Sequence, residues 1–307
     1  MQINLPRTFM PYSQDSIFNE TSTQFYYLEY QLGFKNDIAT IKAALQSALA
    51  AVDNQVNLVV SFGKQAWDLL NPTWSPADLC SYESLTGPKG HAMRSTQRDV
   101  FFWIHSNRHD LNFDQVLHIH DAMKSVGSLD LDLRGFNYHN DLDLIGFEDG
   151  TANPKEDARQ LAALIPDGQD GAGGSYVLSQ KWIHDLKAFK QLSDHQQGLV
   201  VGRTKGGNRE LTGDEMPDDS HISRTDLKVD GQAMKIYRRS DPFGNATEHG
   251  LYFLAFACEI RRFQSQLESM LGLTEDGIHD RLIDFSVAAT TSYWFAPSND
   301  DLKQILD

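Results

Sequence analysis

The sequence predicts an α+β protein with antiparallel sheets, made of two halves of similar design. Strand-like runs are interleaved with helical periodicities in both halves, which favours this fold class. No Gly-x-Gly-x-x-Gly run opens a helix, as a parallel nucleotide-binding sheet would require. A strand-to-helix unit also recurs at equal spacing, which indicates an internal duplication, with a chance match of common apolar residues as the alternative. The two units are Phe101–Ile104 with Phe113 and Leu117, and Leu251–Leu254 with Phe263 and Leu267.

The first half contains four predicted strands with helices between them. Aromatic or apolar runs predict strands at residues 24–32, 57–62 and 100–106, and an alternating run predicts a strand at 129–137. Apolar residues at helical spacing predict three helices. The helices carry Ile38, Ile41, Ala44, Leu45, Ala48 and Leu49, then Trp67, Leu69 and Leu70, and finally Phe113, Val116, Leu117, His120 and Met123.

The second half repeats this alternation. Strands are predicted at residues 175–182, 235–239, 251–258 and 292–296, and helices are predicted through Leu186 and Phe189 and over residues 263–271. Residues 167–174 and 205–220 are polar and Gly-rich, and the second segment is long and has no apolar periodicity, which is typical of a functional or disordered loop. We therefore expect an N-terminal domain of residues 1–140 and a C-terminal domain of residues 141–307, with a break near 138–145.

Composition excludes several classes of partner. The formal net charge is −15 and the isoelectric point is about 5.1, which argues against nucleic acid and against an anionic membrane surface. No run reaches the length of apolar sequence that spans a bilayer. Cys80 and Cys258 belong to no Cys-x-x-Cys pattern, so neither a zinc ribbon nor covalently attached c-type haem is expected. With no secretion signal or twin-arginine pair, the expected location is the cytoplasm.

The first chemical motif is Gly-Phe-Glu-Asp-Gly-Thr-Ala-Asn-Pro at residues 146–154. An apolar run leads into Asp149, whose carboxylate stands just before Gly150. Glycine at this position tolerates unusual backbone angles and allows close approach of a ligand. The alternative interpretation is an ordinary turn in which Asp149 accepts local backbone hydrogen bonds.

Two further motifs lie in the second half. Pro-Asp-Asp-Ser-His ends at His221, and a neutral imidazole is a usual axial ligand of haem iron, although a lone His in a polar loop is commonly only solvated. Arg238 and Arg239 follow a short strand and precede a Pro-Phe-Gly turn at residues 242–244. Arginine offers a permanent charge and a fixed fork of donors. A surface pair that balances an acidic protein is the alternative.

Taken together, these motifs resemble the dye-decolourising peroxidase family, and most closely its compact bacterial cytoplasmic branch. The resemblance covers nearly the whole chain and is strongest from about residue 140. It implies two ferredoxin-like domains with antiparallel sheets and flanking helices, similar to a dimeric α+β barrel, and one haem b per chain in the C-terminal domain. The matching runs are residues 146–154, 173–177, 201–205, 220–221, 238–244, 249–253 and 295–298.

The resemblance also implies roles for individual residues. His221 falls at the position of the proximal iron ligand, Asp149 and Arg238 fall on the distal face, and Ser240 falls at the polar position beside them, where some relatives carry Asn. Arg203 falls where the family contacts a haem propionate. Gly150, Thr151, Leu254 and Phe256 are expected to contact haem, with the last two on one face of their strand. Asp284 is the candidate partner for the second nitrogen of His221.

The implied activity is reduction of hydrogen peroxide through a ferryl intermediate, with dyes, phenolics or porphyrin-type compounds as small-molecule electron donors. The alternatives are a protein that binds, stores or delivers haem, an enzyme that oxidises porphyrinogen, and a haem-free ferredoxin-like enzyme. Trp182, Tyr293 and Trp294 are interpreted as core residues, with electron relay as the alternative. A homodimer or larger assembly is expected, because the family is often oligomeric and the aromatic strands could leave sheet edges to cover.

Overall fold

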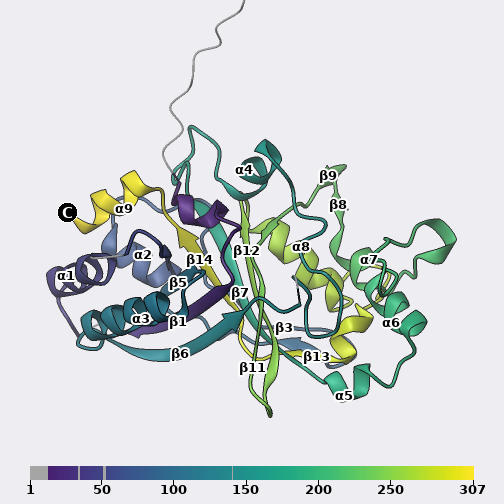
Figure 1. Cartoon of the computed structure of the whole chain (residues 1–307). Coiled ribbons are helices and arrows are strands. Elements are labelled where there is room, and N and C mark those ends of the chain that lie inside the picture. Colours follow the sequence, from purple (N-terminus) through teal and green to yellow (C-terminus); the bar gives the residue numbers. More distant parts are fainter. Residues whose placement is uncertain (1–12, 34, 51–52, 140) are drawn as a thin grey trace, which may run out of the picture.

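The centre of the fold is a closed antiparallel barrel to which both halves of the chain contribute (Figure 1). The computed structural model describes residues 13–33, 35–50, 53–139 and 141–307. Within these ranges eight strands close in the order β12-β11-β6-β1-β5-β2-β14-β7, because β7 also pairs with β12. Their bounds are β1 Gln24–Leu32, β2 Asn57–Phe62, β5 Val100–Ser106, β6 Gly127–Phe136, β7 Ser175–His184, β11 Asp241–Gly244, β12 His249–Ala257 and β14 Ser292–Ala296.

The first half has the β-α-β-β-α-β order of a ferredoxin-like unit. Its strands lie in the order β6-β1-β5-β2, and helices α1 (Ile38–Leu49) and α3 (His109–Met123) pack on the outside of the barrel (Figure 1). Asp37 begins α1 by accepting a hydrogen bond from the backbone N–H of Thr40 at 2.7 Å, which satisfies a donor at the helix start. The shorter α2 (Lys64–Leu70) follows β2, and a two-stranded ribbon of β3 (Leu85–Thr86) and β4 (Ala92–Met93) precedes β5.

The second half repeats the plan with the strand order β11-β12-β7-β14, and α8 (Arg261–Met270) follows β12 as α3 follows β5. A long insertion between β7 and β11 carries most of the smaller elements. They are α5 Leu186–Phe189, α6 Asp194–Val201, η2 Gly213–Glu215, α7 His221–Thr225, β8 Lys228–Val229, β9 Gln232–Ala233 and β10 Tyr237–Arg238. The remaining elements are η1 Asp15–Phe18, α4 Asp157–Ala163, η3 Arg281–Asp284, β13 Ser286–Ala288 and α9 Asn299–Leu306.

The two halves meet at two narrow seams of the barrel. Phe62 of β2 pairs with Phe295 of β14, and Gly135 of β6 pairs with Phe243 of β11, in each case as a single residue pair. Every strand of the ring consequently has a neighbour on both sides. Each seam joins only one residue pair, so the edges of these strands are only partly paired within the described barrel, and self-association through sheet edges stays a prediction.

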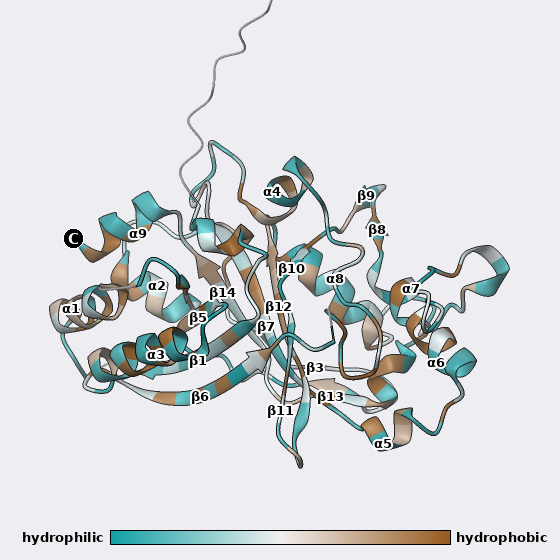
Figure 2. Ribbon diagram, in the orientation of Figure 1, coloured by the Kyte–Doolittle hydropathy of each residue, from teal (hydrophilic) through white to brown (hydrophobic). Residues whose placement is uncertain are grey.

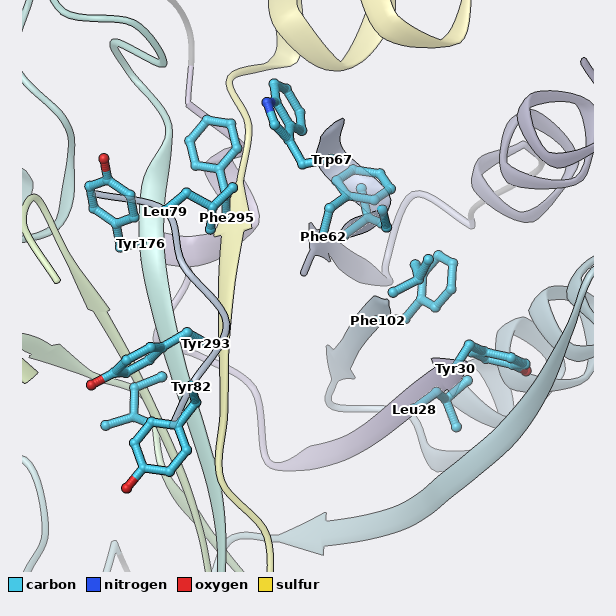
Figure 3. Close-up of a cluster of buried hydrophobic side chains, with 14 of the residues drawn as sticks. Leu28, Tyr30, Phe62, Trp67, Leu79, Tyr82, Phe102, Tyr176, Tyr293 and Phe295 are labelled. Carbon is cyan, nitrogen blue, oxygen red and sulfur yellow. The ribbon is translucent and has the colours of Figure 1, made fainter. Parts of the chain in front are cut away.

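Apolar side chains fill both faces of the barrel wall. The outer face packs against the helices, and Figure 3 shows part of this core, where the Trp67 ring meets the Phe295 ring edge-on at a centroid distance of 4.7 Å. The interior holds a second aromatic core that includes Tyr27, Trp103 and Tyr252. Burial on both faces explains why β5 is a continuous apolar run. Figure 2 shows the same distribution, with hydrophobic strands at the centre and hydrophilic residues on the outer surfaces of the helices.

The structure confirms most predicted elements and corrects several details. The unit β5–α3 matches β12–α8, as the duplication predicted, but the apolar face of α3 differs from the prediction. Val116 and Met123 are buried as predicted, and Ile119 is buried as well, but Phe113 and Leu117 are 45% and 49% exposed. The strand predicted at residues 235–239 is only β10, since the flanking residues leave the sheet. Trp182, Tyr293 and Trp294 are buried, as expected of core residues.

Several elements were not predicted from the sequence, among them the barrel strand β11 and the helices α4, α6 and α9. Helix α6 has the sequence DHQQGLVV, without an apolar repeat, and α4 and α9 are short. Residue 140, at the expected domain boundary, lies outside the described residues. In the portion of the chain that the structure covers, no helix combines the length and apolar character needed to cross a membrane.

Candidate active site

A cavity lies between the β7–β12 wall and the helices α7 and α8. It consists of two adjoining hollows, and His221, Asp149 and Arg238 line both of them. All the residues that line the two hollows belong to the second half of the chain. Much of the wall is apolar, from Ile236, Leu251, Phe253, Phe263, Leu267, Met270 and Leu282.

His221 is the first residue of α7, and its imidazole is held by a buried carboxylate. The hydroxyl of Ser220 accepts a hydrogen bond from the N–H of Ser223, which begins this short helix and fixes the backbone beside His221. His221 Nδ1 lies 2.6 Å from Oδ2 of Asp280, whose side chain is fully buried. The other Asp280 oxygen accepts the N–H of Leu282 at 2.8 Å. With Nδ1 engaged, Nε2 is the nitrogen of His221 that is free to bind a metal.

The partner of His221 differs from the predicted one. Asp284 was expected to contact its second nitrogen, but Asp284 instead lies beside His91 and His279. Asp280 and Asp284 stand at opposite ends of the single turn η3, so their carboxylates point to different surroundings. The sequence offers carboxylates at 276, 280 and 284, and no pattern distinguishes which of them reaches His221.

The structure brings Asp149 and Arg238 together, although they are 89 positions apart in the sequence. Arg238 Nη1 lies 3.2 Å from Asp149 Oδ1, which also accepts the N–H of Gly150 at 2.7 Å. Gly150 has a φ of +80°, a conformation that favours glycine. Both charged side chains are about one-fifth to one-quarter exposed, at 21% for Arg238 and 24% for Asp149. The pair is thus accessible to a small molecule in the cavity.

Asn153 fastens the two segments that carry this pair. Its side-chain amide donates to the carbonyl of Arg238 at 2.8 Å and accepts the N–H of Arg238 at 3.0 Å. This double hydrogen bond fixes the loop that carries Asp149 against β10. Asn153 lies within the motif at residues 146–154, but sequence reasoning gave it no role. Its place at the end of a Gly-rich loop was the available signal.

Four other predicted site residues lie in two places, the larger hollow of the cavity and a neighbouring hollow. Thr151 and Arg203 line the larger hollow, and the Arg203 guanidinium bonds Glu210 Oε2 at 2.6 Å. Ser240 and Gly150 line a neighbouring hollow that also reaches Asp149 and Arg238. The hydroxyl of Ser240 accepts a long 3.4 Å hydrogen bond from the N–H of Leu254.

The structure corrects the expected positions of Leu254 and Phe256. Both side chains are fully buried in the barrel interior, with Tyr252, and neither lines the cavity. The cavity wall is formed instead by Leu251 and Phe253 of the same strand. Successive side chains of a strand point to opposite faces, so an error of one residue moves the whole set to the other side.

A second charged-residue pair, Asp143 and His184, also lines the cavity and was missed. Asp143 Oδ1 lies 3.3 Å from His184 Nε2, and the opposite ring nitrogen of His184 bonds the hydroxyl of Ser286 at 2.6 Å. Asp143 and His184 are both buried. Asp143 precedes the quoted motif, and His184 ends the strand β7, so neither stood in a recognisable pattern.

The residues present are suited to a haem group. One free imidazole nitrogen, backed by a carboxylate, is the arrangement that orients an axial ligand and increases its basicity. Apolar walls suit a flat macrocycle, and the Arg203 guanidinium in the lining offers a positive charge to an acidic substituent. The Asp149–Arg238 pair adds an acid–base group and a fixed positive charge to the same cavity.

Comparisons with known proteins agree with this description. The family model described as "Dyp-type peroxidase, N-terminal" matches residues 20–137, and the one described as "Dyp-type peroxidase, C-terminal" matches residues 140–301. A "Dye-decolorizing peroxidase" of Rhodococcus erythropolis is 35% identical over 248 residues, which cover 80% of this chain and 72% of that protein.

Two solved structures are similar over almost their entire length. One is a putative dyp-type peroxidase protein from Shewanella oneidensis, with 30% identity and a TM-score of 0.90, covering 96% of this chain and 99% of that one. The other is a variant of Rhodococcus jostii DypB in complex with heme, with 33% identity and a TM-score of 0.86, covering 93% of this chain and 96% of that one.

Proposed function

Because the chain belongs to the Dyp-type peroxidase family and is a haem-dependent peroxidase, we propose that His221 binds the iron of haem b. We further propose that Asp149 and Arg238 act on hydrogen peroxide. The observation that carries the proposal is that all three residues line one cavity, with His221 Nδ1 engaged by Asp280 and the Asp149–Arg238 pair formed. Haem, when bound, supplies the iron that binds peroxide and the electrons that cleave its O–O bond.

We propose that Arg238 stabilises developing negative charge. Its guanidinium keeps its charge at any working pH and is already oriented by the ion pair with Asp149 and by the backbone hydrogen bonds of Asn153. A preorganised donor of this kind costs no rearrangement when charge develops on the departing oxygen of peroxide. Removing one such donor typically costs about 3–4 kcal/mol of barrier.

Asp149 is proposed to move the proton. Reduction of peroxide requires a proton to leave one oxygen and a proton to arrive on the oxygen that departs as water. Asp149 Oδ1 is occupied by Arg238 and by the N–H of Gly150, whereas Oδ2 has no hydrogen-bond partner among the described residues. Oδ2 is therefore the oxygen proposed to accept the proton and return it, directly or through a water molecule.

The remaining predicted site residues are proposed to position the haem. Arg203 in the cavity lining is suited to a propionate, and its bond to Glu210 implies that the two anions share one guanidinium or that Glu210 moves aside. Thr151 and Gly150 belong to the loop beside the cavity, and Ser240 lies in the neighbouring hollow as a polar group near Arg238. These roles extend the proposal made for His221.

The reaction needs hydrogen peroxide and a reducing substrate, as the family implies. We propose that the donor is a small molecule such as a dye, a phenolic or a porphyrin-type compound. The expected C-terminal haem-binding domain of residues 141–307 fits the position of the cavity lining. Assembly as a homodimer or larger remains a prediction that sedimentation would test, and a cytoplasmic location remains one that cell fractionation would test.

The test is a haem titration followed by a peroxide reaction. Purified protein is expected to bind one haem with an intense Soret band, and one equivalent of peroxide should change that band at once. His221→Ala should lose most of the haem. Full retention of haem by this variant with an unchanged spectrum would contradict the ligand assignment. If haem binds through His221 but does not react with peroxide, the result would instead favour a haem carrier. That role does not require the Asp149–Arg238 pair.

A further inference from the structure

Two histidines and an aspartate converge at a place that the peroxidase chemistry does not use. His91 directly precedes β4, and His279 and Asp284 flank and end the turn η3. His91 Nε2 lies 3.0 Å from Asp284 Oδ1, and His279 Nε2 lies 2.9 Å from the same oxygen. The two imidazole rings are stacked, with centroids 5.1 Å apart and planes 19° apart. None of the three side chains lines the proposed haem cavity.

We propose that His91, His279 and Asp284 form a binding site for a divalent first-row transition metal of the zinc class. The three ligand atoms lie within 4.8 Å of one another. Imidazole nitrogen and carboxylate oxygen are ordinary zinc ligands at about 2.0–2.2 Å, which places neighbouring ligand atoms roughly 3.3 Å apart in a tetrahedral site. The observed separations of 2.9 and 3.0 Å are slightly shorter, so a small outward movement of the side chains would admit the ion.

The backbone already holds the ligands in place from two separate segments. The carbonyl of His91 accepts the N–H of Gly87 at 2.9 Å, and a turn closed by Gly90 fixes the loop between them. On the other side, the N–H of Asp280 donates to the carbonyl of Met270 at 2.9 Å, which anchors the residue after His279. Preorganised ligands lower the entropy that binding must offset.

The site is open to solvent on one side. His279 is mostly buried, but the side chains of His91 and Asp284 are 31% and 40% exposed. An ion could therefore enter without unfolding of the surrounding chain. Three protein ligands with an accessible fourth position leave room for a water molecule, as in zinc sites that are not closed by a fourth side chain.

A bound ion would connect the β3–β4 ribbon to the segment that supports His221. Residues 279–284 include Asp280, which holds His221 Nδ1, as well as Leu282, which lines the cavity. The ion would accordingly act as a structural cross-link, and a ligand that binds only the folded state raises the unfolding temperature. The inference concerns metal binding and does not depend on the peroxidase mechanism.

Zinc binding to tag-free, haem-loaded protein tests the proposal. After treatment with a chelator and removal of the chelator, bound zinc is measured by equilibrium dialysis with elemental analysis. The unmodified chain is expected to retain one Zn²⁺ per molecule and to melt at a higher temperature with zinc than without it. His91→Gln and Asp284→Asn should lose both effects. His195→Gln removes an exposed histidine elsewhere and should preserve both.

The main competing description is a metal-free hydrogen-bonded cluster in which both imidazoles donate to Asp284. That description predicts that the unmodified chain binds no zinc at micromolar concentrations, or that His91→Gln and Asp284→Asn bind as much as the parent. Either result would overturn the metal site. Two independent variants guard against a folding defect in one of them. Haem content and reaction with peroxide are measured on the same samples, so loss of the metal proposal would leave the proposed function standing.

Discussion

Arg238 and Asp149 are joined by an ion pair of 3.2 Å, and Asn153 ties the backbones of their two segments together. Substitution of either charged residue therefore changes the other. Without Arg238, Asp149 loses its cationic partner, and without the Asp149 carboxylate the guanidinium loses the anion that orients it. This coupling determines how variants of the pair should be compared.

Loss of Arg238 is expected to be the more damaging change. Arg238→Leu should slow the peroxide-dependent change of the Soret band by roughly 100-fold or more, because a preorganised charge is removed. Asp149→Asn removes a proton carrier, typically about 100–10,000-fold, but water could carry part of the transfer. Stopped-flow mixing of haem-loaded variants with peroxide measures both rates.

Arg108→Leu is the matched control for this series, because Arg108 forms an exposed ion pair with Asp110 far from the cavity lining. It should react at the parent rate. Parent rates in both Arg238→Leu and Asp149→Asn would remove the catalytic assignment.

The hydrogen bond between Asp280 and His221 should adjust the electronic character of the iron ligand. Asp280→Asn retains an oxygen for the backbone N–H of Leu282 but removes the negative charge beside His221. We expect a weaker iron–histidine bond, a higher reduction potential and roughly 10–100-fold weaker haem binding. Resonance Raman spectra of the reduced protein and haem titration would measure these changes. In zinc-free protein, substitution of the residue that the sequence wrongly suggested, Asp284→Asn, should leave both measurements unchanged.

Alternate residues of β12 should respond differently to truncation. Leu254→Ala creates a cavity in the barrel interior and should cost about 2–5 kcal/mol of unfolding free energy, with little effect on haem affinity. Leu251→Ala removes a side chain from the wall of the haem cavity and should weaken haem binding at a smaller cost in stability. Denaturant unfolding and haem titration of both variants separate the two effects. The reverse pattern would show that the faces of this strand are assigned incorrectly.

A buried carboxyl inside the barrel should make stability depend on pH. Burial raises the pKa of Glu29 from 4.5 to about 7, while its Oε1 accepts a hydrogen bond from the Tyr252 hydroxyl at 2.8 Å. The folded chain then keeps a proton that the unfolded chain has lost. This contribution to stability is complete below about pH 4.5 and is lost as the pH rises through about 7.

Glu29→Gln should consequently flatten the fall in melting temperature between pH 5 and pH 8. The gain in stability at pH 8 is expected to be up to roughly 3 kcal/mol, from a pKa difference of about 2.5. Asp241, whose pKa burial raises to about 8, should preserve part of the slope. A variant whose melting temperature changes with pH as steeply as that of the parent would exclude Glu29 as the source.

Much of this fold could be predicted because its signals are local. The runs at residues 24–32, 57–62 and 100–106 have the β-branched and aromatic composition of strands, and the structure places β1, β2 and β5 there. Closure into one barrel was not derivable from composition or periodicity, since its seams are two isolated residue pairs far apart in sequence. The resemblance to a known family provided the barrel-like architecture instead.

The site was predictable where motifs are compact and unpredictable where contacts are long-range. His221, Asp149 and Arg238 line one cavity, as expected, because each stands in a recognisable run. Asp280 was missed because its contact with His221 spans 59 positions and carboxylates recur every four residues around it. Leu254 was misplaced because an apolar run buried on both faces gives no indication of which face meets the cavity.

Because the two halves of the barrel belong to one polypeptide, the barrel should stay closed when the protein is diluted. When two separate chains close such a ring, the ring dissociates as concentration falls. Here β2 meets β14 and β6 meets β11 within one polypeptide, so ring closure is a unimolecular event with a fixed effective concentration. The haem cavity, whose wall includes ring strands β7 and β12, should thus persist in very dilute protein, whatever assembly the chain adopts.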